Sequence, residues 1–180
     1  TVTGTLEASI QAPADLTVSN ATGLCSANIS AAALGIPVVQ SCAQVFTGRS
    51  RDDGKNFNAP YPVGETTITY SIWGFDEYGF YVEYDSDEQV VTVVDDEEPI
   101  VSAVNGSLTV ECIASAVTPV VVPTATDNCD ITVNGVLESI VDSPDPLACE
   151  GSRVYTYSYT DEAGNVSYWT YTYIIDDITN

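Results

Sequence analysis

The chain has 180 residues, of which 44% are hydrophobic and 17% charged, so it is not a disordered acidic tail. Its 26 acidic residues against 4 basic ones give a formal net charge of −22, which makes nucleic acid and anionic membranes poor partners, because phosphate contacts need clustered cations. The absence of His removes the commonest general base and any Ser-His or Cys-His nucleophile, so we expect no enzyme.

The first half of the chain predicts a series of short strands. Residues 1–9 look like a connector. Residues 44–60 predict a hairpin with a long loop that holds most of the basic charge, and residues 85–88 predict an acidic turn. The expected strands are 12–18, 25–29, 37–39, 66–73, 80–84 and 90–94.

The second half repeats this plan. Its clearest element is a hairpin from 154–160 to 167–175, joined across residues 161–165. No segment shows a sustained helical period. The other expected strands are 108–110, 117–122, 131–136 and 137–141. Short strands with turns every 8–12 residues predict an all-β, immunoglobulin-type β-sandwich.

One ending occurs twice and predicts the domain organisation. An apolar stretch runs into Asp95-Asp96, and a second runs into Asp176-Asp177, 81 positions later (176 minus 95). That spacing suits one small all-β domain, so we expect two tandem domains, at 10–95 and 96–177. Residues 178–180 would begin the next linker, and the chain would be a piece of a longer array.

Aromatic residues alternate along the last hairpin. Tyr155, Tyr157 and Tyr159 share one face of the first strand, and Trp169, Tyr171 and Tyr173 share one face of the second. Such a stripe could stack on sugar rings, but cross-strand packing in the core is the favoured interpretation.

Several motifs resemble those of hyalin repeat (HYR) domains. Residues 61–70, Tyr-Pro-Val-Gly-Glu-Thr-Thr-Ile-Thr-Tyr, followed by Asp-Glu-Tyr-Gly at 76–79, are similar to the family's PVGTTTVTYTATDxxGN pattern. Thr-Asp-Asn-Cys at 126–129 and the hairpin at 156–165 resemble HYR-like repeats of large bacterial surface proteins. The first domain departs from the pattern at Phe80, where Asn is usual, and at residues 40–42, where Asp-Asn-Cys is usual.

The resemblance implies immunoglobulin-like sandwiches in tandem arrays, with an adhesive or spacer role outside the cell. The Tyr- and Thr-rich second domain looks most like repeats of giant cell-surface adhesins of Bacteroidota, some of which serve gliding motility. We therefore expect a secreted, non-catalytic repeat of an adhesin or extracellular filament, whose partners are neighbouring repeats and surface glycans.

The five cysteines predict disulfides. Cys25 and Cys42 are 17 positions apart, as are Cys112 and Cys129, so we expect one disulfide in each domain. Loops of that size would contribute roughly 3 kcal/mol each. Cys149 is left over, either as a buried free thiol or, less expected, as an intermolecular bond; related repeats often have Cys at the position of Glu162.

Acidic hinges predict calcium as a cofactor, since Ca²⁺ takes six to eight oxygen ligands. The alternative is a solvated charge run, because no EF-hand ligand order is present. The candidate ligands are Asp95, Asp96, Glu97 and Glu98, with Asp127, Asp161 or Asn165 from loops, and Asp176 and Asp177 at the second hinge.

Two further functions are weighed against the structural repeat. A carbohydrate-binding module would use exposed aromatics, for which the candidates are Trp73, Tyr78, Phe80 and Trp169. A glycosidase with paired carboxylates is disfavoured, since a small sandwich lacks a deep cleft.

No apolar run reaches the length of a membrane span. Four Asn-x-Ser/Thr sequons, the acceptor motif for N-glycosylation, begin at Asn20, Asn28, Asn105 and Asn165.

Overall fold

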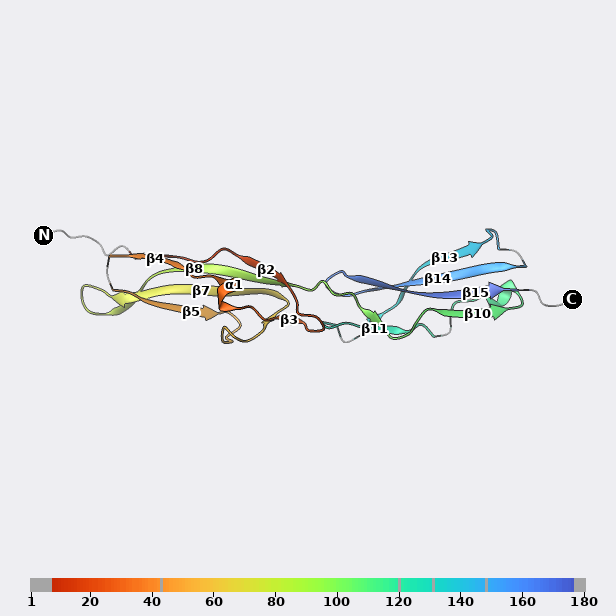
Figure 1. Cartoon of the computed structure of the whole chain (residues 1–180), viewed down its shortest axis with the longest axis horizontal. Helices are drawn as coiled ribbons and strands as arrows, with labels where there is room; N and C mark the ends of the chain where they lie inside the picture. The colour runs from red at the N-terminus through yellow and green to blue at the C-terminus, as the bar shows by residue number, and fades with distance from the viewer. Residues whose placement is uncertain (1–7, 43, 120, 131, 148, 177–180) are drawn as a thin grey trace. The chain divides into compact units, whose positions relative to one another are not determined.

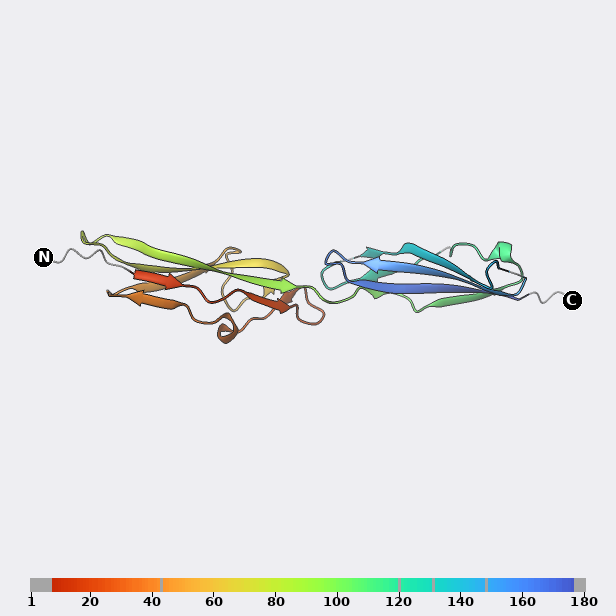
Figure 2. The same cartoon turned by 90° about the horizontal axis from the view of Figure 1, so that it is seen from above.

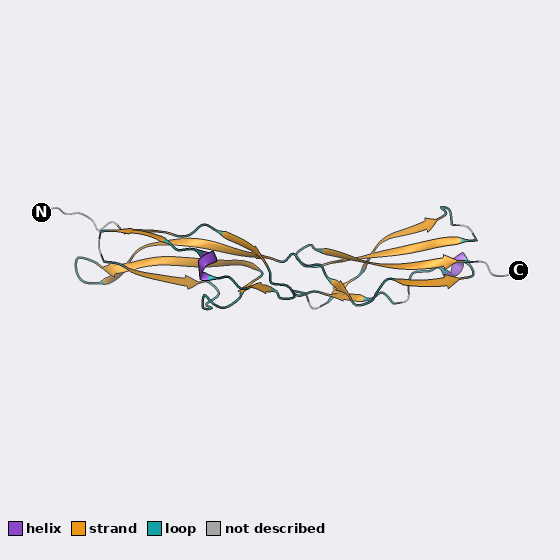
Figure 3. Ribbon diagram, viewed as in Figure 1, coloured by secondary structure: helices purple, strands orange, loops and turns teal. Residues whose placement is uncertain are grey.

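The structure is a computed structural model that describes residues 8–42, 44–119, 121–130, 132–147 and 149–176. The chain divides into two compact units, Thr1–Asp95 (unit 1) and Asp96–Asn180 (unit 2). Almost all regular structure is strand, with one four-residue α-helix and one short 3₁₀ helix among the described residues (Figure 3). The predicted all-β fold class is confirmed.

Unit 1 is built on a long hairpin. The strands β7 (Gly64–Phe75) and β8 (Tyr81–Val94) pair antiparallel over their length and lie side by side in Figure 1. The strand β5 (Phe46–Arg51) pairs antiparallel with β7, and β2 (Leu16–Ser19) pairs parallel with β8. The four-stranded sheet therefore has the order β2-β8-β7-β5.

Two smaller sheets and a helical turn cover that sheet. β1 (Ala8–Gln11) pairs with β4 (Val38–Ser41), and β3 (Ser26–Ala27) pairs with β6 (Tyr61–Pro62). The helix α1 (Ala31–Leu34) begins at Ser30, whose Oγ accepts from Ala33 N at 3.2 Å, and it ends at Gly35, whose φ of +83° suits glycine. The core between the layers is mainly aliphatic, with two tyrosines, and its buried residues are Ile10, Ala27, Leu34, Tyr61, Ile68, Tyr70, Ile72, Val91 and Val93.

The expected acidic turn at residues 85–88 is wrong, because these residues lie inside β8. Their carboxylates instead accept backbone N–H groups of the β1 segment. Asp85 Oδ2 accepts from Ile10 N at 2.9 Å, and Asp87 Oδ2 accepts from Ala12 N at 2.8 Å. Acidic residues that look like a turn signal in the sequence therefore join the two layers of unit 1.

Unit 2 has two sheets. The larger has the order β10-β15-β14-β13, formed by β10 (Gly106–Val110), β15 (Val166–Ile175), β14 (Gly151–Thr160) and β13 (Val136–Ser143). The smaller has the order β12-β11-β9, formed by β12 (Val133–Asn134), β11 (Thr124–Thr126) and β9 (Ile100–Val101). The β14–β15 pair is the clearest hairpin in both views, as the sequence predicted (Figures 1 and 2).

One expected strand of unit 2 is absent. Among the described residues between 117 and 122 there is no strand, and the 3₁₀ helix η1 (Ile113–Ser115) precedes them. Pro119 interrupts this apolar run and Pro123 follows it. Proline cannot donate to a ladder, so the run crosses between sheets as a loop although its residues favour strands.

The core of unit 2 is aromatic. The favoured interpretation of the Tyr/Trp stripe is confirmed, because five of its six rings are buried and Tyr171 packs against them partly buried. Trp169 is 4% exposed and its Nε1 donates to Val104 O at 2.8 Å. The buried residues are Ala116, Ala125, Val133, Tyr155, Tyr157, Tyr159, Trp169, Tyr173 and Ile175.

Candidate functional site

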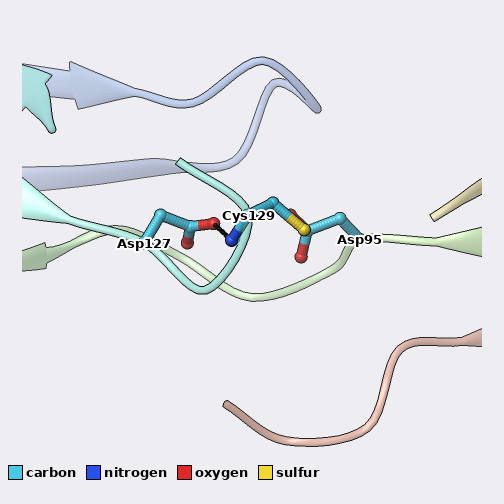
Figure 4. Close-up of side chains that lie close together, drawn as sticks. All are labelled: Asp95, Asp127 and Cys129. Carbon is cyan, nitrogen blue, oxygen red and sulfur yellow. Dashed lines mark hydrogen bonds between the residues drawn. The ribbon is translucent and has the colours of Figure 1, made fainter. Parts of the chain in front are cut away.

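The residues predicted to bind calcium are only partly brought together. Ligand atoms of Asp95, Asp127 and Cys129 lie within 4.8 Å of one another, the one such group found among the described residues (Figure 4). Cys129 is disulfide-bonded, so its sulfur is not a thiolate ligand. Two carboxylates remain in the group, fewer than the six to eight oxygens that Ca²⁺ takes.

Asp127 offers one oxygen to a cation. Its Oδ2 accepts from Cys129 N at 2.8 Å, which holds the turn after β11. Its Oδ1 is buried and has no hydrogen-bond partner among the described residues. A buried carboxylate oxygen without a donor is costly, and a cation would satisfy it. This oxygen is the observation that best fits a metal ion here.

The other predicted ligands are placed elsewhere. Asp96 and Glu98 are exposed and Glu97 is half-buried, and none of the three belongs to the group around Asp127. Asp176 is exposed and its N–H donates to Val110 O at 3.0 Å. Asp177 lies outside the described residues.

Asp161 serves the β14–β15 turn. Its Oδ1 accepts from Gly164 N at 2.6 Å and Asn165 N at 2.8 Å, and its Oδ2 accepts from Asn165 Nδ2 at 2.9 Å. Asp76 does the same in the β7–β8 turn, where its Oδ1 accepts from Tyr78 N at 2.9 Å and Phe80 N at 2.8 Å. The repeated Asp-Glu-x-Gly motif is therefore a turn-forming element in both units.

The predicted disulfide pairs are wrong. Cys42 and Cys112 are free, whereas Cys25 and Cys129 are each disulfide-bonded. In unit 1, Cys42 follows the residue that pairs with Ala8 at the start of β1, whereas Cys25 precedes β3, near the end of β2. The two cysteines therefore lie at opposite ends of the unit.

The same holds in unit 2. Cys112 follows β10 at the end where Val110 pairs with Ile175. Cys129 lies at the opposite end, beside the β14–β15 turn, where Glu162 N donates to the adjacent Asp130 at 2.9 Å. The two cysteines of each predicted pair, although equally spaced in the sequence, thus lie at opposite ends of their sandwich, too far apart for a disulfide bond.

Three cysteines are free and exposed, namely Cys42, Cys112 and Cys149. Cys149 has no disulfide partner among the described residues and is exposed, so its expected burial is wrong, while the intermolecular bond stays a prediction. The pKa of Cys112 is lowered, chiefly because the Ser115 hydroxyl lies 3.4 Å from its sulfur and hydrogen-bonds the thiolate. A lowered pKa raises the thiolate fraction and hence the reactivity of this exposed thiol.

Some of the candidate sugar-stacking residues are buried and others are exposed. Trp169 is buried and cannot meet a ligand. Trp73 stacks on Tyr81 with ring centroids 5.7 Å apart, and Tyr81 also contacts Phe75 and Phe46. Tyr78 and Phe80, in the adjoining turn, are 76% and 67% exposed. Among these candidates, the exposed aromatics of unit 1 are therefore the ones available to a partner.

Two of the four cations are structural. The Arg51 side chain is buried, packs 3.8 Å over the Tyr61 ring, and donates to carbonyls of the following loop and to Asp53. Arg153 makes two bonds to Asp142, at 2.7 and 2.9 Å, and donates to Ala116 O at 3.2 Å. The Arg153 guanidinium lowers the pKa of Asp142 below its ordinary value.

The comparisons with known proteins identify the second unit. Residues 100–175 match the family model described as an HYR-like domain with 4 cysteines. Unit 2 resembles an HYR-like domain. The predicted family resemblance is thereby confirmed for these residues, which hold three cysteines rather than four. No curated protein matches the chain.

Solved structures with which the chain aligns include three protocadherin ectodomains. Protocadherin gamma B7 domains 1–4 align at 9% identity and a TM-score of 0.33, covering 94% of this chain and 50% of that one. Protocadherin gamma C5 domains 1–3 align at 9% identity and a TM-score of 0.35, covering 94% of this chain and 68% of that one. Protocadherin gamma B2 domains 1–5 align at 13% identity and a TM-score of 0.32, covering 94% of this chain and 40% of that one. At these identities and TM-scores, the likeness says nothing about what this chain binds.

No helix among the described residues is long and apolar enough to cross a membrane.

Proposed function

We propose that this chain is a pair of non-catalytic repeats from a secreted cell-surface adhesin or extracellular filament, and that each repeat bears tension. The HYR-like family of residues 100–175 supports an extracellular, adhesion-type repeat. The carboxylates of Asp76, Asp85, Asp87 and Asp161 support a structural role, because they accept backbone N–H groups. In its narrowest form, the proposal is that the adhesin is bacterial and takes part in gliding motility.

The observation that carries the proposal is a parallel strand pair in each unit. In unit 1, β2 pairs parallel with β8, the last strand, and in unit 2, β10 pairs parallel with β15, the last strand. A pull applied before the first strand of a pair and after the last one slides the two strands past each other. All hydrogen bonds of the pair then resist together, whereas an antiparallel terminal pair would open one bond at a time.

Single-molecule force spectroscopy on the full chain tests this mechanism. Asn20 N donates to Val94 O at 2.9 Å, so by ladder alternation the N–H of Val18 points into the same parallel pair. We expect Val18→Pro to lower the unfolding force of unit 1. Thr17→Pro is the matched control, since the N–H of Thr17 points away from β8. Equal unfolding forces in both variants and the wild type would contradict a load-bearing β2–β8 pair.

We also propose calcium as a cofactor, on the support of the buried Asp127 Oδ1. Calorimetry after chelation, with Ca²⁺ up to millimolar concentration, measures it directly. We expect a binding isotherm that Asp127→Asn weakens and that Asp96→Asn, at an exposed hinge position, leaves unchanged. The absence of heat at millimolar Ca²⁺ would remove this part of the proposal without affecting the mechanical one.

Carbohydrate binding is the second candidate function, and the exposed aromatic cluster around Trp73 and Tyr81 favours it. Affinity electrophoresis in gels that contain neutral polysaccharides tests it. We expect retardation that Tyr81→Ala reduces and that Tyr168→Ala, an exposed tyrosine of unit 2, does not. A pure spacer would migrate unretarded in every gel.

A further inference from the structure

Unit 1 is hollowed between its layers. An open groove of about 940 Å³ separates the α1 segment and β4 from β5 and β7. One wall is formed by small and apolar residues, among them Ala32, Ile36 and Val39, and the other by Thr47 and Arg49, with Tyr70 also lining the groove. A concave apolar surface of this size is typical of sites for small organic ligands.

The groove is left open by the residues that border it. Ala31, Ala32 and Gly35 present little or no side chain, while Leu34, the large residue of α1, is 1% exposed and belongs to the core instead. Ile36 is 85% exposed, which is unusual for an isoleucine at the edge of a core. Apolar surface is therefore available beside the groove as well as within it.

One charged side chain lines the groove. The Arg49 guanidinium lies 4.0 Å from the centre of the Phe57 ring, which holds it by a cation–π contact. Among the described residues no carboxylate lies within ion-pair distance of Arg49, although the chain has 26 acidic residues. Tyr70 lines the same groove as Arg49, and the positive charge of Arg49 opposes the rise in the pKa of Tyr70 that burial causes.

We propose that this groove binds a small organic anion that has an apolar body and one carboxylate or sulfonate group. The apolar body lies against Ala32, Ile36 and Val39, and the acidic group pairs with Arg49. A neutral ligand would leave the guanidinium without a counter-charge, and a cation would be repelled by it. The proposal is independent of the load-bearing role, which requires no ligand.

The test uses 8-anilinonaphthalene-1-sulfonate as the fluorescent probe on the full chain. We expect saturable binding with one site per chain. Arg49→Gln should weaken it roughly tenfold, as expected for a lost charge-assisted contact, and Arg49→Lys should weaken it less. Ala32→Trp should abolish binding by filling the groove. Lys55→Gln is the matched control, because Lys55 is a neighbouring cation that does not line the groove. Circular dichroism checks that each variant is folded.

Competition by dodecanoate and by benzoate then distinguishes an alkyl from an aromatic body. Displacement by either acid supports the proposal, and failure of both overturns it. Binding that is not saturable, that survives Ala32→Trp in a folded protein, or that falls equally in Lys55→Gln would also overturn it. Probe binding that disappears as the chain dimerises in analytical ultracentrifugation would show that a second copy fills the groove, which contradicts a small-molecule site.

Discussion

The β7–β8 hairpin of unit 1 and the β14–β15 hairpin of unit 2 close with the same kind of turn but make different use of aromatic residues. In each turn an aspartate caps the backbone, and a glycine with positive φ, +83° at Gly79 and +96° at Gly164, lets the chain reverse. In unit 2 the aromatic rings face the core, whereas in unit 1 the rings around Tyr81 lie on an exposed face. A shared turn motif therefore fixes the hairpin but not which side of it is available to a partner.

The largest expected effect is on stability, and it tests whether the aromatic residues of unit 2 are more deeply buried than those of unit 1. Tyr159 is fully buried and its hydroxyl donates to Pro123 O at 2.8 Å, so Tyr159→Ala should cost about 4 kcal/mol of unfolding free energy. Tyr159→Phe should cost about 1 kcal/mol, the share of the hydrogen bond. In unit 1, Tyr81→Ala should cost under about 1 kcal/mol, because Tyr81 is 54% exposed.

Urea denaturation followed by tryptophan fluorescence measures these values, since each unit contains one of the two tryptophans. Trp73→Phe leaves Trp169 to report on unit 2, and Trp169→Phe leaves Trp73 to report on unit 1. A cost for Tyr81→Ala as large as that for Tyr159→Ala would contradict the contrast between an exposed and a buried aromatic cluster.

The next largest effect should come from replacing the turn aspartates, which should lower the stability of the two units by different amounts. Asp161 is 7% exposed and both its oxygens accept hydrogen bonds, so Asp161→Ala should destabilise unit 2 by about 2 kcal/mol. Asp76→Ala should destabilise unit 1 by about 1 kcal/mol, because Asp76 is more exposed and makes fewer bonds. Asp161→Asn is the control that keeps an acceptor oxygen. The same denaturation assay applies, and a larger loss at Asp76 would reverse the order.

A pH dependence should follow from Asp142. Its pKa is lower in the folded state than in the unfolded chain, so the contribution is present above the unfolded value and lost as the pH falls through the folded one. We expect the melting temperature of unit 2 to decrease as the pH is lowered below about 4, the range where free aspartate titrates. Asp142→Asn should flatten this dependence. Equal pH profiles in the variant and the wild type would argue against the Arg153 pair.

The smallest effect concerns thiols rather than stability. Iodoacetamide without reductant should label Cys42, Cys112 and Cys149, and should label Cys25 and Cys129 only after reduction. Ser115→Ala should slow the labelling of Cys112, because the hydroxyl that lowers its pKa is gone. Peptide mapping measures both. Labelling of Cys25 in the native, unreduced chain would contradict the assigned disulfide.

Periodicity predicted the elements that depend on local chemistry. The strands of the last hairpin follow from alternating Tyr and Thr, and the turns follow from Asp and Gly at fixed positions. Residues 85–88 were predicted wrongly because their role depends on a distant part of the chain, and residues 117–122 because Pro119 and Pro123 override their strand-favouring composition. The carboxylates of β8 meet β1, and the prolines exclude an apolar run from the ladder.

The sequence by itself determined the all-β class, the repeated acidic endings and the resemblance of the second half to HYR-like domains. Only the tertiary structure decided which aromatics are buried, which cysteines are bonded, and that Arg49 lines a groove with no carboxylate within ion-pair distance among the described residues. The reason is that side-chain alternation and turn chemistry act over a few residues, whereas a disulfide or a groove depends on which ends and faces of a sandwich meet. Equal spacing of 17 residues put each predicted cysteine pair at opposite ends of its unit, and no local pattern could have revealed that.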